Sequence, residues 1–101
     1  MSYQTEFNLF VETISTNTEL DNVIDIVKAD AVGGSIEITL PIAGLNPGKE
    51  YRIKKIDVSF NAVSLIPSGS DTIDGETSFE IGSPQEGYSF ISDGVSTWMV
   101  F

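Results

Sequence analysis

The chain has 101 residues, 41% of them apolar, which is enough for one domain with a single hydrophobic core. Fifteen acidic residues against five basic ones give a net charge of -10, which argues against binding to nucleic acid or to a membrane, because both need surplus Lys and Arg. Cysteine and histidine are absent, so thiolate nucleophiles, the usual zinc ligands and the commonest general base are missing, and we expect no enzymatic activity, no metal and no cofactor.

The first 20 residues contain fewer turn signals than the rest of the chain. Apolar and polar residues alternate in them, which predicts a strand over residues 4–14 with an apolar stripe that needs a partner. The apolar residues of this stripe are Phe7, Leu9 and Val11. We expect residues 1–20 to form either an N-terminal arm that grips a neighbouring molecule or an edge strand, and residues 21–101 to form a single β domain.

The segment from Thr18 to Lys28 has two interpretations. Its apolar residues have helical spacing, and Thr18 with Asp21 could begin a helix. β-Branched residues dominate the segment, however, and they favour a buried strand. We favour a strand over residues 22–28.

Alternation of apolar and polar residues continues to the C-terminus, and the turn-forming residues Gly, Asn, Asp and Pro interrupt it roughly every 8–12 residues. The remaining predicted strands are 35–40, 50–59, 62–66, 77–82, 87–92 and 96–101. This pattern predicts an all-β fold, a small antiparallel β-sandwich or jelly-roll-like barrel of about eight short strands. The predicted core residues are Ile36, Ile38, Leu40, Ile53, Ile56, Ile73, Phe79, Ile81, Phe90 and Trp98, with Trp98, Phe90 and Ile73 as its anchors.

Four of the five basic residues lie within seven positions of one another, at Lys49, Arg52, Lys54 and Lys55. One interpretation is a docking patch for an acidic partner surface, including that of another copy of the chain. The other is a solvated strand whose cations pair with carboxylates such as Glu37 or Asp57. Both interpretations can hold together, because a subunit contact can use the same charges.

Two further groups of residues have both a functional and a structural interpretation. Asp71, Asp74 and Glu76 could offer oxygen ligands to calcium, but their spacing matches no defined calcium loop and Asp74-Gly75 is an ordinary turn. An aromatic set could form a platform on which a sugar stacks, although the apolar run around Trp98 is more typical of a core or an interface. The aromatic set is Trp98, Tyr51, Tyr88 and Tyr3.

An ordered series of short motifs covers residues 35–101. The series is Ile38-Thr39-Leu40-Pro41, Asn46-Pro47-Gly48-Lys49, Tyr51-Arg52-Ile53-Lys54-Lys55-Ile56-Asp57, Asn61-Ala62-Val63, Ile66-Pro67, Thr72-Ile73-Asp74-Gly75, Ser92-Asp93-Gly94 and Trp98. This order resembles a β-module of bacteriophage virion proteins, which include capsid decoration proteins, head fibres and tail-fibre domains.

The resemblance implies a structural virion protein without catalytic residues, which assembles as a homotrimer and contacts the major capsid protein or another virion protein. A chain that starts at Met1 and holds one module favours a capsid decoration or cement protein. The alternatives are a tail-fibre or receptor-binding module that contacts a host glycan or protein, and a carbohydrate-binding domain of a cellular protein. The resemblance implies a location in the virion, on the capsid surface or in the tail.

Overall fold

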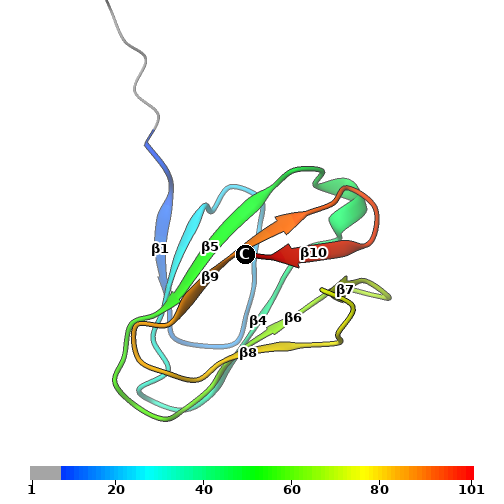
Figure 1. The fold of residues 1–101 in the computed structure, drawn as a ribbon. Helices are drawn as coiled ribbons and strands as arrows, with labels where there is room; N and C mark the ends of the chain where they lie inside the picture. The colour runs from blue at the N-terminus through cyan, green and yellow to red at the C-terminus, as the bar shows by residue number, and fades with distance from the viewer. Residues whose placement is uncertain (1–7) are drawn as a thin grey trace, which may run out of the picture.

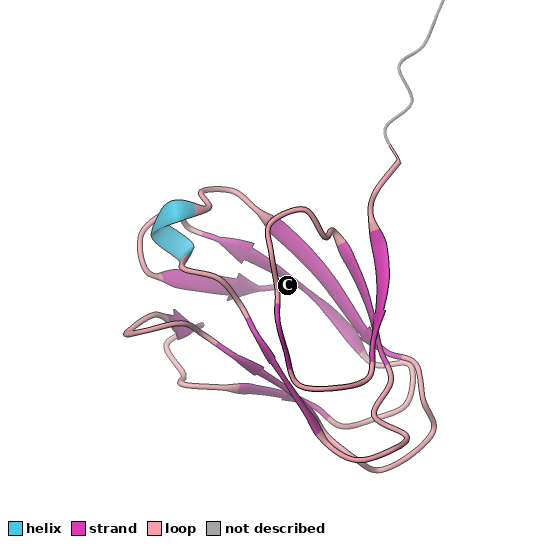
Figure 2. Ribbon diagram, turned by 180° about the vertical axis from the view of Figure 1, so that it is seen from behind, coloured by secondary structure: helices cyan, strands magenta, loops and turns pink. Residues whose placement is uncertain are grey.

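The computed structural model describes residues 8–101, which form two β-sheets packed face to face (Figure 1). Helix within these residues is limited to one 3₁₀ turn at Ala43–Leu45, and none is long and apolar enough to cross a membrane (Figure 2). The strands are β1 (Val11–Ile14), β2 (Thr18–Glu19), β3 (Ile26–Ala29), β4 (Ile36–Thr39), β5 (Glu50–Lys55), β6 (Val63–Ile66), β7 (Thr72–Ile73), β8 (Phe79–Ile81), β9 (Gly87–Ser92) and β10 (Thr97–Val100).

Successive strands alternate between the two sheets. The six-stranded sheet has the order β1-β3-β5-β9-β10-β7, and the four-stranded sheet has the order β2-β4-β6-β8. Only the last two strands follow each other within one sheet, as a hairpin that turns at Asp93-Gly94. Because the chain crosses to the other sheet and returns, β1, β3 and β5 are parallel, and so are β2, β4 and β6. Residues 11–66 therefore wind like a short β-helix.

The predicted small all-β fold is confirmed, and the segment 18–28 contains no helix. The sheets are mixed, however, whereas the sequence pattern led us to expect antiparallel pairing: five of the eight strand pairings are parallel. Turn residues mark where a chain reverses direction. They do not show whether the next strand pairs with the previous one or crosses to the opposite sheet, and a crossing connection produces parallel neighbours.

The core lies between the sheets and contains most of the residues expected there. Eight of the ten predicted core residues are at most 4% exposed, and the anchors Trp98, Phe90 and Ile73 are fully buried. Phe79 packs against the core while partly buried, and Ile56 is half-buried. Phe79 sits edge-on to Phe90, with ring centroids 5.5 Å apart, and so connects the two sheets.

The N-terminal segment contributes an edge strand to each sheet. β1 pairs with β3 at the edge of the larger sheet, and β2 pairs with β4 at the edge of the smaller one. Ile14 and Leu20 are 5% and 3% exposed and belong to the core. Phe7, by contrast, lies outside the described residues.

Candidate functional site

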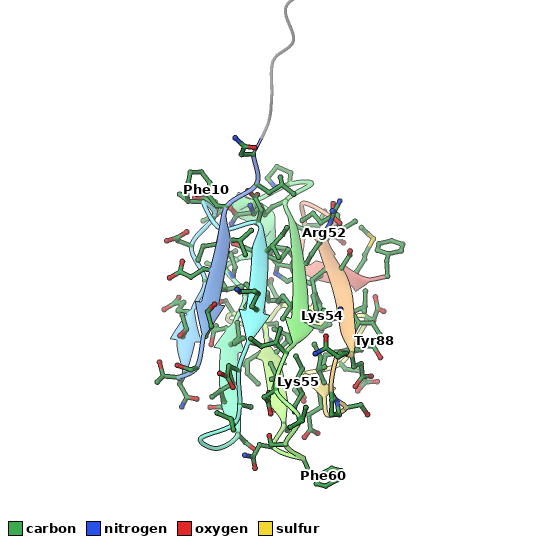
Figure 3. All side chains as sticks on the ribbon, turned by 90° about the vertical axis from the view of Figure 1, so that its left-hand side faces the viewer. Phe10, Arg52, Lys54, Lys55, Phe60 and Tyr88 are labelled. Atoms are coloured by element: carbon green, nitrogen blue, oxygen red, sulfur yellow. The ribbon has the colours of Figure 1, made fainter. Side chains whose placement is uncertain are left out.

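Residues that are far apart in the sequence meet on the outer face of the six-stranded sheet. In the parallel register, Val11 lies beside Ile26 and Ile26 beside Arg52, while Lys28 lies beside Lys54. On β3 and β5 the alternate residues are buried, and on β1 the buried Ile14 lies three positions after Val11, so these side chains point outward. Figure 3 shows Arg52 and Lys54 along β5, with Phe10 at one end of the same sheet. We call Lys28, Arg52 and Lys54 the cationic face.

Leu9 and Lys49 join this face at the end where β1 begins. A depression of about 200 Å³ there is lined by Leu9, Asp25, Gly48, Lys49, Glu50 and Arg52. The Asp25 carboxylate connects the two sides of this depression. It accepts a hydrogen bond from the Phe10 N–H at 2.9 Å and forms an ion pair with Lys49 Nζ, also at 2.9 Å. The bond from Phe10, followed by that from Lys49, lowers the pKa of Asp25. The segment before β1 is thus fastened to the start of β5.

A second depression, of about 400 Å³, lies on the same face between β5 and β9. Its lining includes Arg52, Lys54, Ser89 and Phe101, and the Phe101 side chain is exposed. Glu50 Oε2 accepts a hydrogen bond from Arg52 Nε at 3.1 Å, while Lys54 has no ion pair within residues 8–101. Two cations beside an exposed aromatic ring can receive an acidic side chain.

Lys55 does not belong to this face, and the expectation that it lies in an exposed docking cluster is wrong. Tyr51, Ile53 and Lys55 share the buried side of β5, because alternate residues of a strand share a face. The fully buried Lys55 Nζ lies 2.8 Å from Asp57 Oδ2 and donates to the Ser59 carbonyl at 2.6 Å. Its ion pair with Asp57 agrees with the pairing that the second interpretation of the basic cluster expected, although Lys55 is buried and not solvated.

Asp57 is held as a carboxylate in this buried pair. Burial raises its pKa, but hydrogen bonds from Lys55 Nζ, from Ser59 and from the Ala31 N–H outweigh burial and hold the pKa far below its usual range. The arrangement joins the end of β5 to the loop after β3, so it supports the fold and does not form an exposed site.

Within residues 8–101, the aromatic residues of the predicted set do not form a sugar platform. Trp98 and Tyr51 are both fully buried and pack with ring centroids 5.5 Å apart. Tyr88 packs edge-on against Phe79 at 4.9 Å, and Tyr3 lies outside the described residues. Trp98 and Tyr51 therefore fill the core and are not available to stack on a ligand.

The acidic loop uses its carboxylates within the fold. Asp71 Oδ2 accepts a hydrogen bond from the Ala43 N–H at 2.8 Å, and Asp74 Oδ1 accepts one from the Val100 N–H at 3.2 Å. Asp74 has a φ of 49°, a turn conformation that Asp tolerates better than most residues. Within residues 8–101, no three carboxylates come close enough together to hold a metal ion.

Lys28 on the cationic face and the exposed Phe10 at its end were not among the predicted site residues. Lys28 is 21 residues from the nearest basic residue, and only the parallel pairing of β3 with β5 places it beside Lys54. Phe10 falls on the polar side of the predicted stripe, yet its side chain is 62% exposed beside Leu9 and Val11, which are 47% and 55% exposed. An edge strand exposes residues of either parity, and this explains the difference.

Comparison with known proteins identifies no family for this chain. No protein-family model matches the chain, and no curated protein matches it in sequence.

Proposed function

We propose that this protein is a structural virion protein that coats a capsid surface as a homotrimer and has no catalytic role. The observation that carries the proposal is that Leu9, Val11, Arg52 and Lys54 gather on one exposed face, with the partly buried Lys49 at its end. The motif series over residues 35–101, which resembles the virion β-modules, supports it independently.

The composition of this face suits a contact between proteins. Exposed apolar side chains at Leu9 and Val11 lie near the exposed Arg52, a combination of apolar core and polar rim that is typical of protein interfaces. β1 is also an edge strand of the sheet that residues 8–101 form, and an edge strand can pair with a neighbouring chain. The sandwich then acts passively, as a rigid support for this surface.

A receptor-binding module of a tail fibre is the second candidate function. The depression of about 400 Å³ favours it, because Arg52, Lys54 and the exposed Phe101 could hold an acidic sugar of a host glycan. The burial of Trp98 and Tyr51 speaks for assembly over sugar binding in a cellular carbohydrate-binding domain.

The mass of the protein in solution and its capsid binding test the first proposal. We expect sedimentation equilibrium to give three chains of 10.9 kDa, about 33 kDa in total. The double substitution Leu9→Ser/Phe10→Ser should weaken association by about tenfold or more and reduce co-sedimentation with phage capsids, because it removes exposed apolar contact area.

Val58→Ser/Phe60→Ser is the matched control. These side chains are 80% and 96% exposed, and Phe60 lies at the opposite end of the molecule from Phe10 (Figure 3). The control should leave the mass and the capsid binding unchanged. A wild-type protein that stays monomeric and does not bind capsids would contradict the proposed function.

A further inference from the structure

The two outer faces of the sandwich carry opposite charge. The six-stranded sheet presents the cationic face defined above. On the four-stranded sheet, Glu19, Glu37 and Glu80 are exposed next to the buried residues Leu20, Ile38 and Ile81, so they point outward. We call these three glutamates the acidic face. None of the strands β2, β4, β6 and β8 contains Lys or Arg.

The cationic face has an uncompensated charge pair. Lys28 and Lys54 are direct register partners on β3 and β5, about 5 Å apart along the hydrogen-bonding direction of the sheet. Like charges directly opposite each other destabilise a sheet, and neither lysine has an ion pair within residues 8–101. A carboxylate of a docked partner placed between them would relieve this repulsion.

The acidic face carries a wider row of the opposite charge. Glu37 and Glu80 both lie beside Ser64, one on each side, so they form a single row across β4, β6 and β8. The row spans two strand spacings, about 10 Å. Long Lys and Glu side chains on two such rows can meet when the sheets face each other.

We propose that copies of this chain dock front to back, with the cationic face of one copy against the acidic face of the next. Charge complementarity identifies the occupant as a second copy, because the chain itself supplies both signs on opposite sides. The inference rests on the proposed assembly and deepens it by naming the two surfaces in contact. The contact is heterologous and joins opposite sides of the sandwich, so it closes into a trimer only if each contact turns the next copy by about 120°, and otherwise it adds copies in an open row.

Charge reversal on each face tests the contact. Lys28→Glu/Lys54→Glu changes the net charge from -10 to -14, and Glu37→Lys/Glu80→Lys changes it to -6. Each double variant should lose self-association by about 100-fold, because like charges then face each other. An equimolar mixture of the two variants should form heterodimers, since the acidic face of the first meets the cationic face of the second, while a closed trimer cannot alternate two kinds of copy. The quadruple variant keeps the net charge of -10 and should also regain association.

Glu76→Lys serves as a control for charge reversal outside the acidic face. It changes the net charge from -10 to -8, half the change of Glu37→Lys/Glu80→Lys, and Glu76 lies in the link between β7 and β8. The control should leave association unchanged, and thermal melts of all variants report whether they remain folded. If a variant does not fold, salt titration of the wild type decides. Association should rise up to about 0.1 M salt, where long-range repulsion is screened, and fall towards about 1 M, where close pairs are screened.

Several results would overturn the docking mode. If the trimer forms and both double variants keep its mass, the proposed assembly stands and front-to-back docking is wrong. If only the lysine substitutions abolish association, the cationic face contacts something other than the acidic face. If mixing restores nothing, or if association rises steadily to 1 M salt, the contact is not electrostatic between these faces.

Discussion

Replacing Asp57 with alanine should lower the free energy of unfolding by about 3–5 kcal/mol, because the substitution leaves a buried ammonium group without its counter-charge. Lys55 is fully buried, and its Nζ lies 2.8 Å from Asp57 Oδ2. The same carboxylate accepts hydrogen bonds from the Ala31 N–H at 2.9 Å and the Ser59 N–H at 3.0 Å, so these donors also lose their partner. Chemical denaturation of the two proteins measures the loss.

Glu50→Ala is the matched control, because it breaks the exposed ion pair with Arg52. The side chains of that pair are 58% exposed for Arg52 and 35% for Glu50, so solvent screens their attraction and the change should stay within about 1 kcal/mol. In a double-mutant cycle, Lys55→Ala/Asp57→Ala should cost less than the sum of the single substitutions. Equal costs for Asp57→Ala and Glu50→Ala would show that the buried pair does not support the fold.

Acid should reduce the contribution of this pair. The pKa of Asp57 is lower in the folded protein than in the unfolded chain, where it is near 3.8. Its stabilising effect is therefore fully present above about pH 5 and is lost as the pH falls towards the folded pKa. The difference in unfolding free energy between wild type and Asp57→Asn should shrink below about pH 4. A constant difference down to pH 2 would contradict the lowered pKa.

The strands could be predicted from the sequence because the alternation of apolar and polar residues matches the alternation of buried and exposed side chains along a strand. Ile36 and Ile38 flank Glu37, and Tyr51 and Ile53 flank Arg52; the structure buries the apolar residues and exposes the charged ones. Strand direction could not be predicted in this way. The connection after β3 and the connection after β9 both contain turn residues, but only the second makes a hairpin. Which sheet a strand joins depends on packing across the core, which short-range patterns do not contain.

The candidate site could be predicted only in part, for the same reason. Lys49, Arg52 and Lys54 are close in sequence, so this part of the cluster could be predicted. Strand alternation puts Lys55 on the side of Tyr51 and Ile53, but a lysine is seldom buried unless it is paired. Its burial follows from Asp57, which lies near enough to neutralise it within the fold. The meeting of this cluster with Leu9 and Val11 depends on the parallel register of β1, β3 and β5. Long-range pairings of this kind have no signal in a single sequence.

Replacing Trp98 with alanine should also lower the free energy of unfolding by about 3–5 kcal/mol, because it leaves a cavity between the sheets that the backbone cannot close. Trp98 is fully buried on β10 and packs on Tyr51 of β5. Its Nε1–H donates to the Pro41 carbonyl at 3.0 Å, just beyond β4, so the side chain ties the larger sheet to the smaller one. Urea unfolding followed by circular dichroism measures the effect without depending on Trp fluorescence.

Two further substitutions separate the packing of Trp98 from its hydrogen bond. Trp98→Phe keeps most of the ring but leaves the Pro41 carbonyl without its donor, so it should cost about 1–3 kcal/mol, less than alanine. Phe101→Ala removes an aromatic ring that is 69% exposed on the outer face and should change stability by no more than about 0.5 kcal/mol. If Trp98→Ala were as mild as Phe101→Ala, the indole would be exposed in solution, and the aromatic platform for a sugar would again be the better interpretation of this strand. A large loss of unfolding free energy in Trp98→Ala, with none in Phe101→Ala, would show that packing between the sheets stabilises the sandwich. The outer faces can then carry charge for assembly without supporting the fold.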